Sequence, residues 1–151
     1  MPLSDRFLDA LSYAARLHAD QARKISGTPY VAHLLRVAGI VLEFGGGEDE
    51  AIAALLHDAV EDQGGAPRLA EIRARFGPRV AEIVAGCSDT DQSPKPPWRQ
   101  RKEAYLTHLR EASPSVRLVS AADKLDNIRS LLTGYRARGN AIWERFKGGR
   151  D

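Results

Sequence analysis

Apolar residues recur at helical spacing along most of the chain, and the first two stretches show this most clearly. Over residues 4–20 they fall three or four positions apart, which predicts an amphipathic helix whose first turn is capped by Ser4. The second stretch, residues 28–44, opens on a Thr-Pro pair and ends at the glycines at 45–47, which predicts a second helix. Its apolar face carries one residue of a different kind, His33.

Further helical segments follow, separated by glycine, proline or polar residues. Residues 48–62 predict a third helix, which contains the sequence ALLHDAVED and has acidic residues in its first turn. We expect the other helices at 68–76, 78–87, 98–112, 115–135 and 140–147, with a polar, proline-containing loop at 88–97. No run of alternating β-branched residues argues for a sheet, and no internal repeat is present. The pattern therefore predicts an all-α fold.

Length and composition are those of one packed domain. A chain of 151 residues suits a single domain, and 43% hydrophobic with 28% charged residues is ordinary for a globular protein. The formal net charge of +2 gives no reason to expect nucleic-acid or membrane binding. We therefore expect one domain over residues 1–151 that binds neither.

The amino terminus and the cysteine content favour the cytoplasm. The start MPLSDRF lacks the basic and apolar regions of an export signal, and Cys87, the single cysteine, cannot form an intramolecular disulfide. The longest apolar stretches are interrupted by polar residues and fall short of the ~18 residues expected of a membrane span. We expect a cytoplasmic protein without a membrane anchor.

Good metal ligands occur on otherwise apolar helical faces at three places. They are His33, the pair His57-Asp58, and Asp123 within VSAADKLDN. An ionised carboxylate buried without a partner costs several kcal/mol, which a shared divalent ion would offset. Because successive residues on a helix diverge by about 100°, the adjacent His-Asp pair can reach one ion only if the ion lies between helices.

We therefore expect two imidazoles and two carboxylates around one ion. This mixed set suits Mn²⁺, Fe²⁺ or Zn²⁺ better than Ca²⁺, and it leaves coordination positions open for water and substrate. Glu61 and Asp62 lie three and four residues after Asp58, which on a continuous helix places them on the same side, one turn further along. They could orient an attacking water and accept its proton.

Each of these residues also has a simpler interpretation. A histidine on an apolar face is more often a hydrogen-bonded core residue than a ligand, and a His-Asp dipeptide often arises by chance. An acidic pair near a helix end is usually solvated. The coincidence of all four candidate ligands in apolar helical contexts favours the metal site. The residues that we interpret as structural are His18, His108 and Cys87.

Four motifs occur in an order that is characteristic of one family. They are YAARLHADQARKISGTPYVAHLLRVA, AALLHDAVED, RFGPRVAEIVAGCSDT and ADKLDN. Over about residues 10–147 the chain resembles the hydrolase domain of the RelA/SpoT alarmone enzymes and their small stand-alone relatives, within the HD superfamily of metal-dependent phosphohydrolases. The resemblance implies a helical domain with one ion, usually Mn²⁺, between its helices. The ligands that it implies are His33, His57, Asp58 and Asp123, and the catalytic acidic pair is Glu61 and Asp62.

Basic and amide side chains match the nucleotide-binding positions of the family. By the resemblance, Arg23 and Lys24 lie beside the nucleotide and its phosphates, and Asn127 contacts the nucleotide. Without the surrounding motif, a basic dipeptide would be interpreted as an exposed surface feature. The segment KPPWRQRK adds cations near a predicted helix start, and Lys102 within it is a candidate phosphate contact. A solubilising surface patch is the alternative for this segment.

Two features depart from the family pattern. Asp126 stands where relatives commonly carry His or Tyr, and we expect its charge to border the pocket and to weaken the binding of a polyanion. Related small hydrolases also continue beyond the position of FKGGRD into a further helix that can close the site, and we expect this helix either to be absent or to lie outside this sequence. No synthetase domain follows, so any alarmone-related activity should be hydrolytic.

The leading hypothesis is hydrolysis of a nucleotide that carries a pyrophosphate, foremost the 3′-diphosphate of guanosine tetra- or pentaphosphate. One alternative keeps the fold and changes the substrate to a nucleoside monophosphate, NADPH or another phosphoester. A second alternative is a catalytically inactive module that senses a nucleotide. The sequence also leaves a homodimer through apolar helix faces open.

Overall fold

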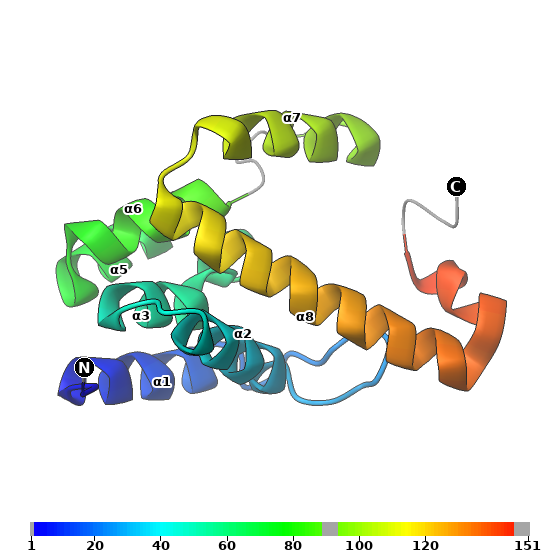
Figure 1. The fold of residues 1–151 in the computed structure, drawn as a ribbon, viewed down its shortest axis with the longest axis horizontal. Coiled ribbons are helices and arrows are strands. Elements are labelled where there is room, and N and C mark those ends of the chain that lie inside the picture. Colours follow the sequence, from blue (N-terminus) through cyan, green and yellow to red (C-terminus); the bar gives the residue numbers. More distant parts are fainter. Residues whose placement is uncertain (1, 89–93, 147–151) are drawn as a thin grey trace.

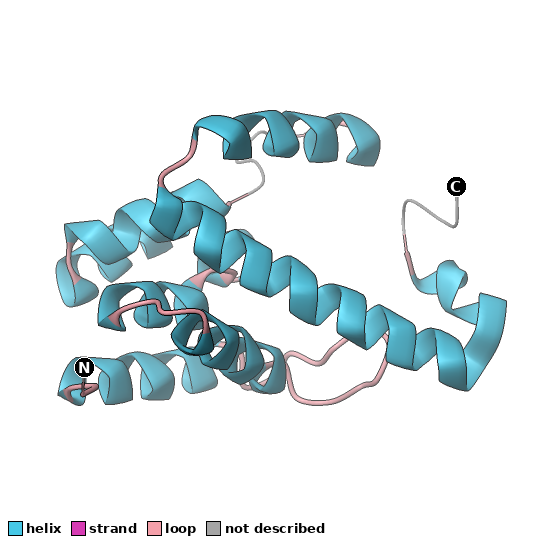
Figure 2. Ribbon diagram, in the orientation of Figure 1, coloured by secondary structure: helices cyan, strands magenta, loops and turns pink. Residues whose placement is uncertain are grey.

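The computed structural model describes residues 2–88 and 94–146, and within them the regular secondary structure is helical apart from one isolated β-bridge between Ala22 and Pro29 (Figure 2). The prediction of an all-α fold is confirmed. Residues 89–93 of the predicted loop, and the last residue of the predicted helix 140–147, lie outside the described residues. The helices are α1 (Asp5–Leu17), α2 (Val31–Glu43), α3 (Glu48–Leu56), α4 (Ala59–Asp62), α5 (Gly65–Phe76), α6 (Pro78–Cys87), α7 (Trp98–Glu111), α8 (Pro114–Arg138) and the 3₁₀ helix η1 (Gly139–Arg145).

The start of α1 is fixed by the cap that the sequence predicts. The Ser4 hydroxyl accepts a hydrogen bond from the backbone N–H of Arg6 at 3.3 Å and donates one to Glu48 at 2.7 Å. The Arg6 guanidinium donates to Asp49 at 2.9 Å and to the carbonyl of Phe76 at 2.8 Å. These contacts join the start of α1 to the start of α3 and the end of α5.

The central helix of the fold is α3. Every residue from Ala51 to Leu56 is fully buried, because α3 packs against α1, α2, α6 and α8. Because other helices surround α3, no side of its sequence AIAALL faces solvent, and all of these residues are apolar. The largest fully buried apolar side chains of the core are Leu34, Val37, Val41, Ile52, Leu55, Leu56, Ile72, Val80, Val84, Val119 and Ile142.

The longest helix, α8, lies across the other helices and extends beyond them (Figure 1). It packs against α2, α3 and α6, and its end packs against η1. Further along, it lies beside the loop that joins α1 to α2, where Arg23 contacts Asn127 and Ile25 lies against Gly134. In this way α8 brings its own polar residues next to those of α2 and the loop.

The prediction of one helix over residues 48–62 is wrong. The segment is divided into α3 and α4, and His57 and Asp58 form the turn between them. Nδ1 of His57 lies 2.6 Å from the carbonyl oxygen of Ala54, so the imidazole provides a hydrogen bond to a carbonyl near the end of α3. No glycine or proline marks this break, which is why the apolar pattern does not reveal it.

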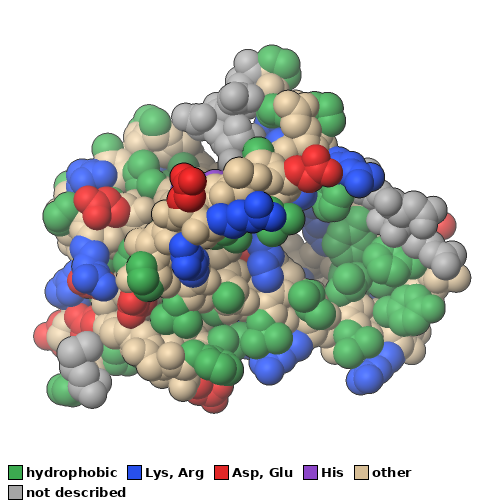
Figure 3. Space-filling view, turned by 45° about the horizontal axis from the view of Figure 1, so that its top comes forward, with side chains coloured by type: hydrophobic (Ala, Val, Ile, Leu, Met, Phe, Trp, Pro, Cys, Tyr) green, Lys and Arg blue, Asp and Glu red, His purple; other side chains and the backbone are tan. Residues whose placement is uncertain are grey.

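Charged side chains of both signs are spread over the face of the molecule shown in Figure 3. In this view apolar side chains gather at the right end, where α8 ends and η1 lies. Two of the partly exposed apolar residues of α8 are Leu132 and Tyr135. Among residues 2–88 and 94–146, no helix combines the length and the apolar character that a membrane crossing requires. A homodimer through exposed apolar side chains stays a prediction.

Replacing Gly86 with alanine is expected to destabilise the fold by about 1–3 kcal/mol. A Cβ atom at Gly86 would lie 2.5 Å from Cγ2 of Val116, because α6 and α8 approach closely there. Gly39→Ala on the exposed side of α2 is the matched control, since nothing lies within 4 Å and alanine favours helix. Urea unfolding measures both, and equal stability of the two variants would contradict the packing argument.

Candidate metal centre

The four candidate ligands lie together, with one nitrogen or oxygen atom of each within 4.8 Å of all the others. Three of them, His33, His57 and Asp123, are buried, and Asp58 is half-buried. They come from α2, from the turn between α3 and α4, and from α8. The described part of the chain thus has a buried His/Asp cluster between its helices.

The separations between these atoms fit a single divalent ion. Nε2 of His57 lies 3.0 Å from Oδ2 of Asp58 and 3.2 Å from Oδ1 of Asp123. Nε2 of His33 lies 3.0 Å from the same oxygen of Asp123 and 3.7 Å from that of Asp58. Two ligands each about 2.1 Å from an ion and at right angles are about 3.0 Å apart. The cluster can therefore hold a divalent metal.

Hydrogen bonds at Nδ1 of both imidazoles orient the two rings for metal binding through Nε2. Nδ1 of His57 lies 2.6 Å from the carbonyl oxygen of Ala54, and Nδ1 of His33 lies 2.6 Å from Oδ2 of Asp126. Because a carbonyl or an ionised carboxylate only accepts hydrogen bonds, each Nδ1 must carry a proton. When each ring is neutral, its Nε2 lone pair faces the centre of the cluster.

The two carboxylates are also held by neighbours. The hydroxyl of Tyr30 donates to Oδ2 of Asp58. Oδ2 of Asp123 accepts from the ammonium of Lys124 at 2.8 Å, and its Oδ1 accepts from Asn127 at 3.1 Å. The roles of Tyr30 and Lys124 were not predicted from the sequence, although Tyr30 lies in PYVAH within the first of the four motifs and Lys124 lies in ADKLDN.

Burial and charge act in opposite directions within the cluster. Burial lowers the pKa of His57, but the carboxylates of Asp58 and Asp123 outweigh it and hold this pKa well above the usual value. Burial raises the pKa of Asp58, while the His57 imidazolium lowers it to about 2. Burial also raises the pKa of Asp123, and hydrogen bonds from His33 and His57 bring it far below the usual range. A positive imidazole thus balances the carboxylates of the metal-free protein.

The metal-free protein is expected to lose stability as the pH falls from about 4 to 2. The pKa of Asp58 is about 2 in the folded chain and about 3.9 in an unfolded chain. Its stabilising contribution, on the order of 2 kcal/mol, is therefore present above the unfolded value and lost as the pH falls through the folded value. Urea unfolding with a chelator tests this, and the loss should be smaller in Asp58→Asn. An equal acid dependence in both proteins would contradict it.

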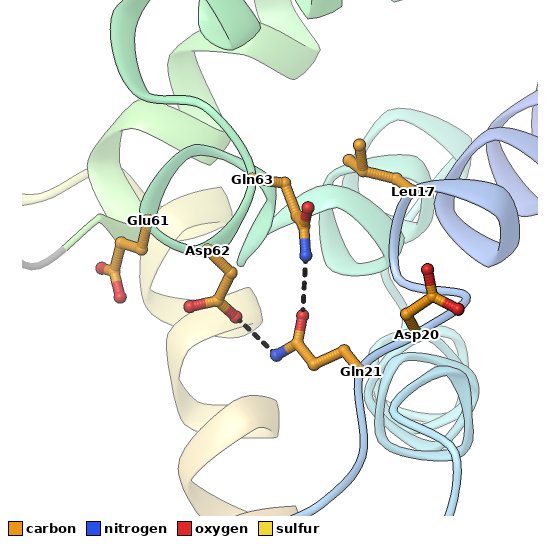
Figure 4. A pocket seen from close by; sticks show the side chains of 6 residues that line it. All are labelled: Leu17, Asp20, Gln21, Glu61, Asp62 and Gln63. Carbon is orange, nitrogen blue, oxygen red and sulfur yellow. Dashed lines mark hydrogen bonds between the residues drawn. The ribbon is translucent and has the colours of Figure 1, made fainter.

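An acidic hollow of about 540 Å³ lies beside α4 (Figure 4). Gln21 lies between Gln63 and Asp62, donating to Asp62 at 3.0 Å and accepting from Gln63 at 3.1 Å. Partial desolvation raises the pKa of Asp62, while the hydrogen bond from Gln21 lowers it, and the net pKa is above the usual value. Glu61 is exposed and lines the same hollow, as does Asp20. Glu61 and Asp62 therefore lie together at its edge.

The candidate nucleotide-binding residues are divided between two regions. The guanidinium of Arg23 donates to Oδ1 of Asn127 at 3.1 Å, and Asn127 in turn reaches the cluster through Asp123. Lys24 is the next residue on the same loop, and its side chain is exposed. Its backbone carbonyl accepts a hydrogen bond from the guanidinium of Arg145 at 2.7 Å. The structure thus joins the loop to the cluster through α8.

The fourth candidate, Lys102, lies half-buried on α7, three residues before Tyr105. Tyr105 is buried, and its hydroxyl lies 2.9 Å from the hydroxyl of Ser120 on α8. The role of Lys102 in phosphate binding stays a prediction.

Asp126 is buried and held by hydrogen bonds, and the weaker polyanion binding that we expect from its charge stays a prediction. Only 1% of this residue is exposed, and both of its carboxylate oxygens are engaged. Oδ1 accepts from Nε of Arg36 at 2.6 Å, while Oδ2 faces Nδ1 of His33. Burial raises the pKa of Asp126, but the hydrogen bonds from Arg36 and His33 outweigh it, so the pKa is lowered and the carboxyl stays ionised. Its charge is balanced locally by Arg36.

The residues interpreted as structural lie outside the four-residue cluster. His18 is buried, with Nδ1 2.7 Å from Oε1 of Gln21, and His108 is exposed with Nε2 3.0 Å from the carbonyl oxygen of Gly86. Burial raises the pKa of the Cys87 thiol to about 12, so it is not an activated nucleophile.

Fold and cluster together define a class of protein. Residues 10–150 match the family model described as an HD domain, and the chain belongs to this family. It is similar to the guanosine-3′,5′-bis(diphosphate) 3′-pyrophosphohydrolase MESH1 of Homo sapiens, with 39% identity over 83% of this chain and 69% of that one. The guanosine-3′,5′-bis(diphosphate) 3′-pyrophosphohydrolase of Aquifex aeolicus is 35% identical over 81% of this chain and 17% of its own length.

A solved structure agrees with these sequence relationships. It superimposes with a TM-score of 0.78 at 34% identity, over 88% of this chain and 74% of the other, and is described as a metazoan ortholog of SpoT that hydrolyzes ppGpp. The resemblance to the RelA/SpoT-type hydrolases is therefore confirmed.

Proposed function

We propose that this chain is a metal-dependent hydrolase that removes the 3′-diphosphate of guanosine 3′,5′-bis(diphosphate) as pyrophosphate. The observation that carries the proposal is the buried His/Asp cluster, whose four ligand atoms lie within 4.8 Å of one another in a chain of the HD domain family. The names of relatives at 35–39% identity supply the substrate.

In this proposal His33, His57, Asp58 and Asp123 hold one Mn²⁺ ion. A bound divalent ion polarises a phosphate oxygen and lowers the pKa of a nearby water. The two imidazoles present Nε2 because hydrogen bonds fix a proton on each Nδ1. Mn²⁺ is proposed over Fe²⁺ and Zn²⁺ because the resemblance to the family favours it.

Glu61 and Asp62 provide the base for the attacking water. Asp62 is held in place by Gln21, and its raised pKa improves its ability to accept a proton near neutral pH. The water then attacks the phosphorus next to the 3′ oxygen, and the bond between that phosphorus and the 3′ oxygen breaks. The 3′ oxygen takes up a proton and stays with guanosine 5′-diphosphate, and the two phosphates, which now carry the oxygen of the water, are released as pyrophosphate.

Arg23, Lys24 and Asn127 position the nucleotide. Arg23 and Asn127 already contact each other at the edge of the cluster, and an arginine fork can bind phosphate or stack on a base. Lys24 and Lys102 are proposed to add positive charge along the phosphates.

The proposal is tested by the products formed from a panel of nucleotides with Mn²⁺. Pyrophosphate and guanosine 5′-diphosphate, formed from guanosine 3′,5′-bis(diphosphate) and blocked by a chelator, are the expected result. Orthophosphate from a nucleoside monophosphate or NADPH, without pyrophosphate from the alarmone, would instead show a phosphatase. Measurable nucleotide affinity without turnover or bound metal would show a sensing module.

A further inference from the structure

One imidazole of the cluster depends on a side chain that the proposed chemistry does not use. His33 points Nε2 at Asp123, 3.0 Å away, and Nδ1 at Asp126, 2.6 Å away on the other side of the ring. Asp126 itself is 1% exposed and is not one of the four candidate ligands. The three groups form a line from a buried carboxylate through the imidazole to the centre of the cluster.

We propose that Asp126 is a positioning residue for the metal centre, which orients the ring of His33 and keeps a proton on its Nδ1. The inference rests on the metal site of the proposed function. A carboxylate that accepts this N–H holds the ring in one tautomer and raises the basicity of Nε2, which strengthens metal binding. Asp126 touches neither the ion nor the substrate and acts through His33.

The second imidazole of the cluster, that of His57, has a backbone carbonyl as its partner instead of a carboxylate. His57 donates its Nδ1–H to the carbonyl oxygen of Ala54, a backbone group three residues earlier that no substitution removes. The bond from His33 to Asp126 is charge-assisted and therefore stronger than a bond to a neutral carbonyl. The two ligands thus depend on different partners, and only that of His33 can be changed by mutation.

Asp126 is itself held in one position. Arg36, one turn after His33 on α2, donates from Nε to one carboxylate oxygen at 2.6 Å and from a terminal nitrogen to the other at 3.3 Å. A terminal nitrogen of Arg23 lies 3.8 Å from Oδ2 of Asp126. A buried carboxylate without such partners would cost several kcal/mol, so the guanidinium groups make it possible to keep Asp126 ionised beside the ligand.

The first test is Mn²⁺ affinity, measured by calorimetry on the full chain. Asp126→Asn keeps the size of the side chain but removes its charge, and we expect the Kd for Mn²⁺ to rise about 10- to 100-fold. Glu50→Gln is the matched control: it also removes one negative charge and weakens hydrogen bonds, here to Gly47 and Ser115, away from the cluster. Its Kd should stay within about twofold of the unmodified protein. Equal affinity of the two variants would overturn the proposal.

A second test reads the His33 ring directly by NMR, first in the unmodified protein and then in Asp126→Asn. The chain has four histidines, so ¹⁵N-histidine spectra of the Zn²⁺-loaded protein can be assigned. The Nδ1–H proton of His33 is expected further downfield than that of His57, because its acceptor is ionised. In Asp126→Asn it should move upfield while that of His57 stays. A proton on Nε2 of His33 in the unmodified protein would overturn the proposal.

The two readouts separate this inference from the proposed function. If Asp126→Asn weakens Mn²⁺ binding but no nucleotide is hydrolysed by the unmodified chain, the positioning role stands and the proposed function fails. If the unmodified chain releases pyrophosphate and Asp126→Asn binds Mn²⁺ equally well, the proposed function stands and the positioning role fails.

Discussion

His57→Ala is expected to lose its bound metal and at least about a thousandfold of its turnover, since a metal ion contributes several kcal/mol to such a reaction. The Nε2 atom of His57 lies 3.0 and 3.2 Å from the oxygens of Asp58 and Asp123, so its removal opens the centre of the cluster. It also leaves two carboxylates close together without the imidazole between them. Asp123→Ala should have the same effect, because it removes the oxygen that both imidazoles approach.

The measurement combines metal content of the purified protein with release of pyrophosphate. His108→Ala is the control, because this histidine is exposed on α7 and contacts a carbonyl of α6. It should keep one ion per chain and full turnover. An active, metal-containing His57→Ala protein would show that the ion is held elsewhere or is not needed.

The second large effect concerns the acidic pair on α4. The double variant Glu61→Gln, Asp62→Asn is expected to lower kcat by about 10²- to 10⁴-fold, the usual contribution of a positioned base. Neither residue is among the four candidate ligands, so the metal content should stay at one ion per chain. Loss of kcat with retained metal is the signature of a base rather than a ligand.

Asp20→Asn is the matched control for this pair. Asp20 lines the same hollow but comes from the loop after α1, and its amide variant should keep kcat within about twofold to threefold of the original. Loss of metal from the double variant would make the pair part of the metal site. Unchanged kcat would move the base to another residue.

The sequence predicts most of the fold because most helices have one buried stripe. Ser4, Pro78 and the glycines near 45 marked helix ends that the structure confirms. The break between α3 and α4 was not predictable in this way. The apolar run continues through it, and the turn depends on a hydrogen bond from the His57 imidazole to the backbone, which periodicity does not record.

The convergence of the candidate ligands was predictable for a different reason. Each is an ionisable side chain in an apolar stretch of sequence, where burial without a partner costs free energy. One shared ion can offset this cost for all four side chains. The partners of these ligands were not predictable. Tyr30 binds a residue 28 positions later, and Arg36 neutralises Asp126 from 90 positions away. The first pair depends on how the start of α2 packs against the turn between α3 and α4, and the second depends on how α2 packs on α8.

The most direct test of the central claim is anomalous X-ray diffraction from crystals grown with Mn²⁺ and measured at the manganese absorption edge. We expect one strong anomalous peak, about 2.0–2.3 Å from Nε2 of both imidazoles and from one oxygen of each carboxylate in the cluster. A peak at another place, or none in crystals that contain Mn²⁺, would contradict it.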